Sequence, residues 1–192
     1  FSFIANEKIQ LNLDVSVSNT NSVADRGQPG FEDKNDLLAT PKSLMLTQAG
    51  DYLKETNIAS ILSLSYKLNS HLSFNSAYLN YITHQDLSEH TFKEYITNDS
   101  IYLNYTNRQV NTVTNNLTNY FTLQFNTGKL NHQLLAGYDF IKSTVDFTNW
   151  NGELTDVFGE GSGIAGTFSL INPQYFTRPV NEYAHTWEEG DE

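Results

Sequence analysis

Apolar and polar residues alternate along much of this chain, which is typical of β-strands with one apolar and one polar face. From Ile9 to Val17 every odd position is apolar and every even position is polar. The same two-residue period recurs further along, and helical spacing is not sustained anywhere. The chain is therefore predicted to be all-β, with strands expected at 1–4, 9–17, 58–68, 72–82, 101–126 and 132–147.

The segments that connect these strands alternate in length. Short turns are expected at 5–8, 69–71 and 127–131, and long loops at 25–56, at 84–98 and after 149. In an antiparallel meander this places every short turn at one end of the sheet. All four prolines fall in the predicted long loops, where they remove no ladder hydrogen bond: Pro29, Pro41, Pro173 and Pro179.

This asymmetry favours a partial transmembrane β-barrel with short periplasmic turns and long extracellular loops. A soluble β-sandwich, whose loops are of mixed length at both ends, is the alternative fold. The residues from Glu182 to Glu192 form no strand or helix that the pattern would predict. Residues 1–192 are therefore expected to be one partial β-barrel domain of about five to six strands, a piece of a longer protein that cannot close by itself.

Composition and charge narrow the range of functions. The net charge of −11 argues against binding to a phosphate backbone, so no nucleic-acid partner is expected. The absence of cysteine excludes a disulfide framework, a thiolate zinc site and a cysteine nucleophile in these residues. No run approaches the ~18 apolar residues of a spanning helix, which excludes a helical membrane protein. The many aromatic residues near strand ends suit the interfacial girdles of a barrel.

Several motifs stand at loop-to-strand junctions, in a hairpin and in a later loop, namely Asp25-Arg26-Gly27, Thr40-Pro41-Lys42-Ser43-Leu44, Gly50-Asp51-Tyr52, the hairpin 115–140 and Asn172-Pro173-Gln174-Tyr175. They resemble those of TonB-dependent ferric-siderophore receptors of the ferrichrome-receptor type. The resemblance implies a 22-stranded barrel in the cell outer membrane, with an N-terminal plug that is absent from these residues. It also implies uptake of a ferric siderophore, a TonB-type energy-coupling protein as partner, and contact with outer-membrane lipid.

No catalytic residue is expected, and the chain is not predicted to be an enzyme. A lipase-like hydrolase on a barrel would need a G-x-S-x-G elbow, which does not occur. His84, Asp86 and His90 fall within one predicted loop, but their spacing matches no recurrent zinc site. The glycine-rich run at 159–166 is not followed by the Lys-Ser or Lys-Thr of a phosphate-binding loop. The resemblance implies that iron arrives already chelated, so neither metal ligands nor a cofactor is expected.

A receptor for a chelate needs aromatic faces for packing and a few polar donors that orient the ligand. Arginine is suited to this role because it makes bidentate contacts with carboxylate, catecholate or hydroxamate oxygens. Tyr102, Arg108 and Trp150 are the expected ligand-binding residues, because they lie near the outer ends of adjoining strands. A receptor for another nutrient, such as cobalamin or an oligosaccharide, remains an alternative function, as does a soluble β-sandwich adhesin or carbohydrate-binding module.

Overall fold

A computed structural model of the chain describes residues 1–33, 39–178 and 180–191. The chain forms one antiparallel sheet in the order β1-β2-β3-β4-β5-β6-β8, with β7 paired to β5. Among the described residues there is no helix of the length and apolar character needed to cross a membrane. The elements are β1 (Ser2–Asn6), β2 (Ile9–Ser22), β3 (Tyr52–Lys67), β4 (Leu72–Thr97), β5 (Ser100–Thr127), β6 (Leu130–Glu153), α1 (Thr155–Phe158), β7 (Gly166–Ser169), η1 (Val180–Glu182) and β8 (Ala184–Asp191).

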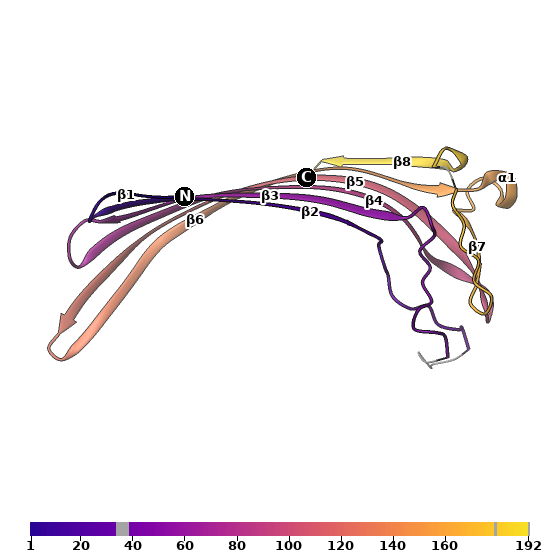
Figure 1. Cartoon of the computed structure of the whole chain (residues 1–192), viewed down its shortest axis with the longest axis horizontal. Coiled ribbons are helices and arrows are strands. Elements are labelled where there is room, and N and C mark those ends of the chain that lie inside the picture. The colour runs from indigo at the N-terminus through magenta and orange to yellow at the C-terminus, as the bar shows by residue number, and fades with distance from the viewer. Residues whose placement is uncertain (34–38, 179, 192) are drawn as a thin grey trace.

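Figure 1 shows a single curved sheet with its short turns at one end and α1, β7 and the described residues that follow β2 at the other. Side chains of the turns fix two of the short reversals. The Asn6 amide oxygen accepts hydrogen bonds from the backbone N–H groups of Lys8 and Ile9. The Asn69 amide oxygen does the same for the backbone N–H groups of His71, in the turn, and Leu72, the first residue of β4. The three short turns expected from the sequence are confirmed.

The register of the strands places the apolar side chains of five strands in common rows. Residues that are paired across an antiparallel ladder lie on the same face of the sheet. One such row crosses the middle of the sheet through Leu13, Leu62, Tyr78, Leu117 and Phe140. We call the side of the sheet that carries this row the apolar face, and the opposite side the polar face.

The apolar face has no second layer packed on it over the middle of the sheet. Large side chains that it carries are exposed among the described residues, namely Val15, Val17, Leu62, Tyr78, Phe121, Tyr138 and Phe140. A β-sandwich would cover such a face with a second sheet about 10 Å away. The all-β antiparallel meander predicted from the sequence is therefore confirmed, and the sandwich alternative is not supported. The sheet is open, with β1 and β8 at its two edges.

The prediction of a long loop at 84–98 is wrong. β4 continues to Thr97 and β5 begins at Ser100, so that a tight turn joins them. Two irregularities of register, between Phe92 and Glu94 and between Tyr95 and Thr97, break the two-residue period in this stretch. The polar residues that suggested a loop are part of a strand, because the backbone of β4 is hydrogen-bonded to that of β5 along this stretch.

The end of the chain also differs from expectation, because β8 pairs with the C-terminal part of β6. The pairing runs from Glu153 opposite Ala184 to Asp146 opposite Asp191. Without β8, the edge of β6 would expose unpaired backbone N–H and C=O groups, which a further strand can satisfy. The sequence of residues 182–191 does not predict this strand, because it shows no alternation of apolar and polar residues. β6 itself extends to Glu153 rather than ending near 147. Pro179 lies outside the described residues.

A substitution at Gly137 tests how closely β6 packs against β5. A Cβ atom added at this glycine would lie 2.2 Å from the carbonyl oxygen of Asn119 and 2.5 Å from the Cβ of Tyr120. Gly137→Ala is therefore expected to destabilise the folded protein by about 1–3 kcal/mol, the usual cost of overpacking. Urea unfolding of the full-length protein in detergent micelles measures this cost. Gly30→Ala is the control, because nothing lies within 4 Å of the added atom there; equal stability of the two variants would contradict the prediction.

Candidate ligand-binding site

β3 begins at Tyr52 opposite Ser88, and the β4–β5 hairpin extends beyond this point at the end of the sheet away from the short turns. We call this extension the upper part of the hairpin. The loops after β2 and β6 pack on this extension and bury two clusters of side chains. The first cluster comprises Leu44, Leu46, Ile101, Leu103, Phe168 and Leu170. The second comprises Tyr105, Trp150, Leu154, Ala165 and Tyr183. These clusters form the core of the described residues and fix the loops above the sheet.

A buried polar clamp of Asp51, His90 and Tyr183 joins three separate segments of this region. His90 Nδ1 lies 2.7 Å from Asp51 Oδ1, and His90 Nε2 lies 2.8 Å from the Tyr183 hydroxyl. The other Asp51 oxygen accepts the backbone N–H groups of Gln48 and His90. Both ring nitrogens of His90 and both carboxylate oxygens of Asp51 therefore have hydrogen-bond partners.

The clamp resembles a catalytic relay in its connectivity but lacks a reactive group at its end. Burial raises the pKa of Tyr183, so its hydroxyl stays protonated at neutral pH. Its ring stacks on Tyr105 with centroids 4.5 Å apart, and burial raises the pKa of Tyr105 as well. The arrangement therefore supports the loops and holds no activated nucleophile.

The three residues expected to bind a ligand do not come together. Arg108 and Tyr102 share the polar face of β5, but they are six residues apart, or about 20 Å along a strand. Asn149 is the β6 partner of Arg108, which places Trp150 on the other face. Trp150 is 8% exposed and packs on Tyr105 with ring centroids 5.5 Å apart. Ligand binding by these three residues stays a prediction.

Arg108 combines a positive charge with an incomplete set of partners. Its Nη2 donates to the side-chain oxygen of Gln85 over 3.0 Å, while its buried Nε has no hydrogen-bond partner. No carboxylate of the described residues lies within ion-pair distance of it. A guanidinium carries five N–H donors, so an anionic oxygen that approaches the polar face finds donors available at Arg108.

Arg26 offers a contrast close by on the polar face. Its Nε and Nη2 donate to the two oxygens of Glu89 over 2.7 and 2.6 Å. The hydrogen bond to Glu89 raises the pKa of Arg26, and Glu89 is 5% exposed. The charge of Arg26 is therefore already compensated. Gln85 and Glu89 could not be identified as partners from the sequence, because both fall in the stretch 84–98 that the pattern predicts to be a loop.

An open hollow of about 380 Å³ lies between the loop after β2 and the edge of upper β4. The aromatic rings of Phe92 and Tyr95 meet there with centroids 4.9 Å apart, and the Tyr95 hydroxyl donates to the Gly30 carbonyl. The lining residues are Arg26, Gly27, Gln28, Pro29, Gly30, Leu46, Thr91, Phe92 and Tyr95. An aromatic and apolar surface of this kind, next to Arg26, suits the packing of an organic chelate.

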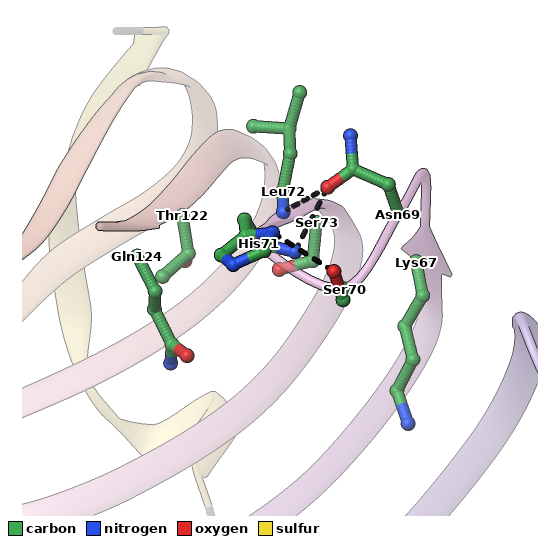
Figure 2. A pocket seen from close by; sticks show the side chains of 8 residues that line it. All are labelled: Lys67, Asn69, Ser70, His71, Leu72, Ser73, Thr122 and Gln124. Carbon is green, nitrogen blue, oxygen red and sulfur yellow. Dashed lines mark hydrogen bonds between the residues drawn. The ribbon is translucent and has the colours of Figure 1, made fainter. Parts of the chain in front are cut away.

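A second hollow, of about 320 Å³, lies at the short-turn end of the sheet (Figure 2). Ser70 and His71 lie in the turn, and Thr122 and Gln124 approach from β5. The Asn69 amide oxygen accepts from the turn backbone there, and the Ser70 hydroxyl bonds to His71 Nδ1 over 2.8 Å. This hollow is at the opposite end of the sheet from Arg108, and we assign the candidate site to the Arg108 end.

His84, Asp86 and His90, which were considered above as possible zinc ligands, lie along β4, and each has a different hydrogen-bond partner. His84 contacts the side chain of Asn111, and Asp86 accepts from the Tyr52 hydroxyl over 3.2 Å. His90 belongs to the clamp described above. Within the described ranges no group of three or more histidine or acidic side chains is arranged to hold a metal ion.

Comparison with solved structures finds a similar fold in the siderophore receptor PiuA from Acinetobacter baumannii. The TM-score is 0.76 at 15% sequence identity, and the match covers 99% of this chain and 29% of the receptor chain. The chain therefore spans less than a third of the length of that protein. No protein-family model and no curated protein matches the sequence. The likeness shows that the chain shares the fold of a segment of that receptor chain.

The clamp predicts a stability effect that is confined to the loops. His90→Leu removes the imidazole and leaves one oxygen of the buried Asp51 carboxylate without its hydrogen-bond partner, which is expected to cost about 1–3 kcal/mol. Tyr183→Phe removes only one hydroxyl and should cost about 1–3 kcal/mol. Limited proteolysis at residues 39–51 measures the loss, because cleavage follows local opening. Wild-type cleavage rates in His90→Leu would show that the clamp does not hold these loops.

Proposed function

We propose that this chain is part of an outer-membrane receptor for the TonB-dependent uptake of a ferric siderophore. The observation that carries the proposal is a one-layer sheet with an uncovered apolar face on one side and Arg108 on the other. The outer membrane is the environment in which an uncovered apolar face of a sheet is stable, provided that further strands close the barrel. The TonB-type partner belongs to the same proposal and is supported only by the receptor likeness.

The dimensions of the apolar face support the membrane assignment. On β4 the apolar residues of this face begin at Leu72 and end at Ile82. This stretch matches the ~9–11 residues that a transmembrane strand requires. Aromatic rings gather near the short-turn end, where Phe74 and Phe121 pack with centroids 5.0 Å apart. Rings at this level suit the interface between lipid and water.

Neighbouring residues in the middle of β5 test which face meets lipid. Leu117→Arg places a charge on the apolar face and is expected to cost about 2–4 kcal/mol of folding free energy in a bilayer. Thr118→Arg points to the polar face and should be tolerated far better. Folding of the full-length protein into lipid vesicles measures both costs. A larger penalty for Thr118→Arg would assign the faces the other way round.

The ligand is proposed to be an iron chelate with anionic oxygen donors. Arg108 would contact these oxygens, because its charge has no acidic partner in the described part of the chain. A separate aromatic surface is present in the hollow beside Phe92 and Tyr95, but Phe92 is the partner of Leu103 and so lies on the opposite face from Arg108. Tyr102 and Trp150 are retained as proposed ligand residues, of which Tyr102 is the one on the same face as Arg108. No catalytic step is proposed, since the chelate would be bound and transported unchanged.

Removal of the Arg108 charge tests the ligand assignment. Arg108→Ala is expected to weaken binding by about tenfold or more, the range for a hydrogen bond to a charged group, and Arg108→Lys should recover part of the loss. Lys129→Ala is the control, because it removes one positive charge in the short turn after Gly128.

Binding and uptake are measured in iron-starved cells that express the full-length protein. The probes are radioiron complexes of hydroxamate, catecholate and citrate ligands, with labelled cobalamin as a non-iron probe. Specific uptake of one iron complex that falls in Arg108→Ala but not in Lys129→Ala supports the proposal. Uptake of cobalamin alone, or equal effects of the two variants, would overturn it.

A further inference from the structure

The loop that follows β6 is pinned at both ends and exposed in between. Leu154 and Ala165 are buried in the second cluster. The backbone N–H of Leu154 donates to the Ile164 carbonyl over 2.9 Å, and that of Ala165 donates to the Leu103 carbonyl over 2.8 Å. Between these anchors Val157 is 66% exposed. The two ends lie side by side, so the segment from 155 to 164 can move as a flap while its base stays fixed.

The side chain of Glu153, the last residue of β6, holds this segment down. One carboxylate oxygen accepts the N–H of Gly161 over 3.0 Å, and the other accepts the N–H of Gly163 over 2.7 Å. Both glycines have positive φ values, of 77° and 60°, a conformation that favours glycine and that turns both amides toward one anion. The Ser162 hydroxyl lies 3.5 Å from the same carboxylate.

The electrostatics of Glu153 agree with this geometry. The backbone hydrogen bonds from Gly161 and Gly163 hold the pKa of Glu153 below its usual range. Lys93 contributes in the same direction, and its Nζ lies 3.0 Å from the position that a Cβ on Gly163 would take. The carboxylate therefore stays ionised at neutral pH and keeps its hydrogen bonds to the loop.

The held segment covers a residue that the proposed function uses. The ring of Phe158, at the end of α1, meets the ring of Tyr102 edge to face with centroids 5.7 Å apart. Tyr102 lies on the polar face, as Arg108 does. Phe158 also packs against the second cluster, so opening of the flap must separate its ring from this cluster as well as from Tyr102.

We propose that residues 155–164 form a lid over Tyr102, and that Glu153 is the latch that keeps it closed. Only the assignment of Tyr102 to the ligand rests on the proposed function. The latch sets how often the Tyr102 ring is accessible from solvent, because opening must break the hydrogen bonds of one carboxylate while the buried anchors at Leu154 and Ala165 remain in place.

Hydrogen–deuterium exchange of the full-length protein in detergent micelles tests the latch. In Glu153→Gln the amides of 159–164 are expected to exchange about tenfold faster than in the wild type, because charge-assisted hydrogen bonds are lost. Glu160→Gln is the matched control: it removes the same charge from the same loop, and the Glu160 side chain makes no hydrogen bond or ion pair within the described residues. Equal exchange in the two variants would overturn the proposal.

Cysteine labelling at position 102 tests the cover itself. The 192 residues contain no cysteine, so Tyr102→Cys supplies one thiol in this chain. Maleimide should react about tenfold faster when Tyr102→Cys is combined with Glu153→Gln than when it is combined with Glu160→Gln. Equal labelling rates would show that the segment does not cover Tyr102.

A second variant keeps the test decisive if Glu153→Gln does not assemble. Glu153→Asp keeps the charge but withdraws it by one methylene group, and it should give rates between those of the wild type and Glu153→Gln. Rates equal to those of the wild type for every assembled variant would overturn the latch. None of these measurements needs a ligand, so a failed lid leaves the uptake result for Arg108→Ala untouched, and failed uptake leaves the lid intact.

Discussion

The faces on which Tyr102, Arg108 and Trp150 lie follow from the backbone ladder that joins β2 to β6. Through the middle of the sheet each strand pairs with the next without interruption, so side chains from five strands stand in common rows. Successive residues of a strand point to opposite faces, and a slip by one residue would carry every apolar side chain of that strand to the polar face. The short turns maintain the register, with asparagine side chains bonded to the backbone at Asn6 and Asn69 and a left-handed glycine at Gly128.

Above the apolar band the same ladder supports a small core instead of an open face. Ile101, Leu103 and Tyr105 occupy the alternate positions of β5 that continue the apolar face, and they are buried where Val113 and Phe121 are exposed. The loops provide the second layer that the rest of the sheet lacks. Burial of these side chains supplies the main favourable free energy for packing the loops on the sheet. The clamp through His90 selects one arrangement of the loops, because its buried polar groups have all their hydrogen-bond partners only in that arrangement.

Two arginines on the polar face differ in what they can bind because their partners differ. Arg26 donates to both oxygens of Glu89, so its charge is compensated within the protein. Arg108 meets only the neutral side chain of Gln85 among its hydrogen-bond acceptors in the described residues. Glu153 shows the same principle at the loops, where backbone amides rather than a cation bind the carboxylate. Charge compensation therefore distinguishes groups that hold the structure together from a group that can meet an anionic ligand.

Local sequence was enough to find the strands, the short turns and the apolar positions, because all three follow from the two-residue period of a single strand. It was not enough for 84–98 or for 184–191, where polar residues form strands because another strand supplies the backbone partners. Nor could it relate Tyr102, Arg108 and Trp150, which share only their nearness to strand ends. The pairing of Arg108 with Asn149 places Trp150 on the opposite face. That relation is a property of the register between strands, and no residue carries it alone.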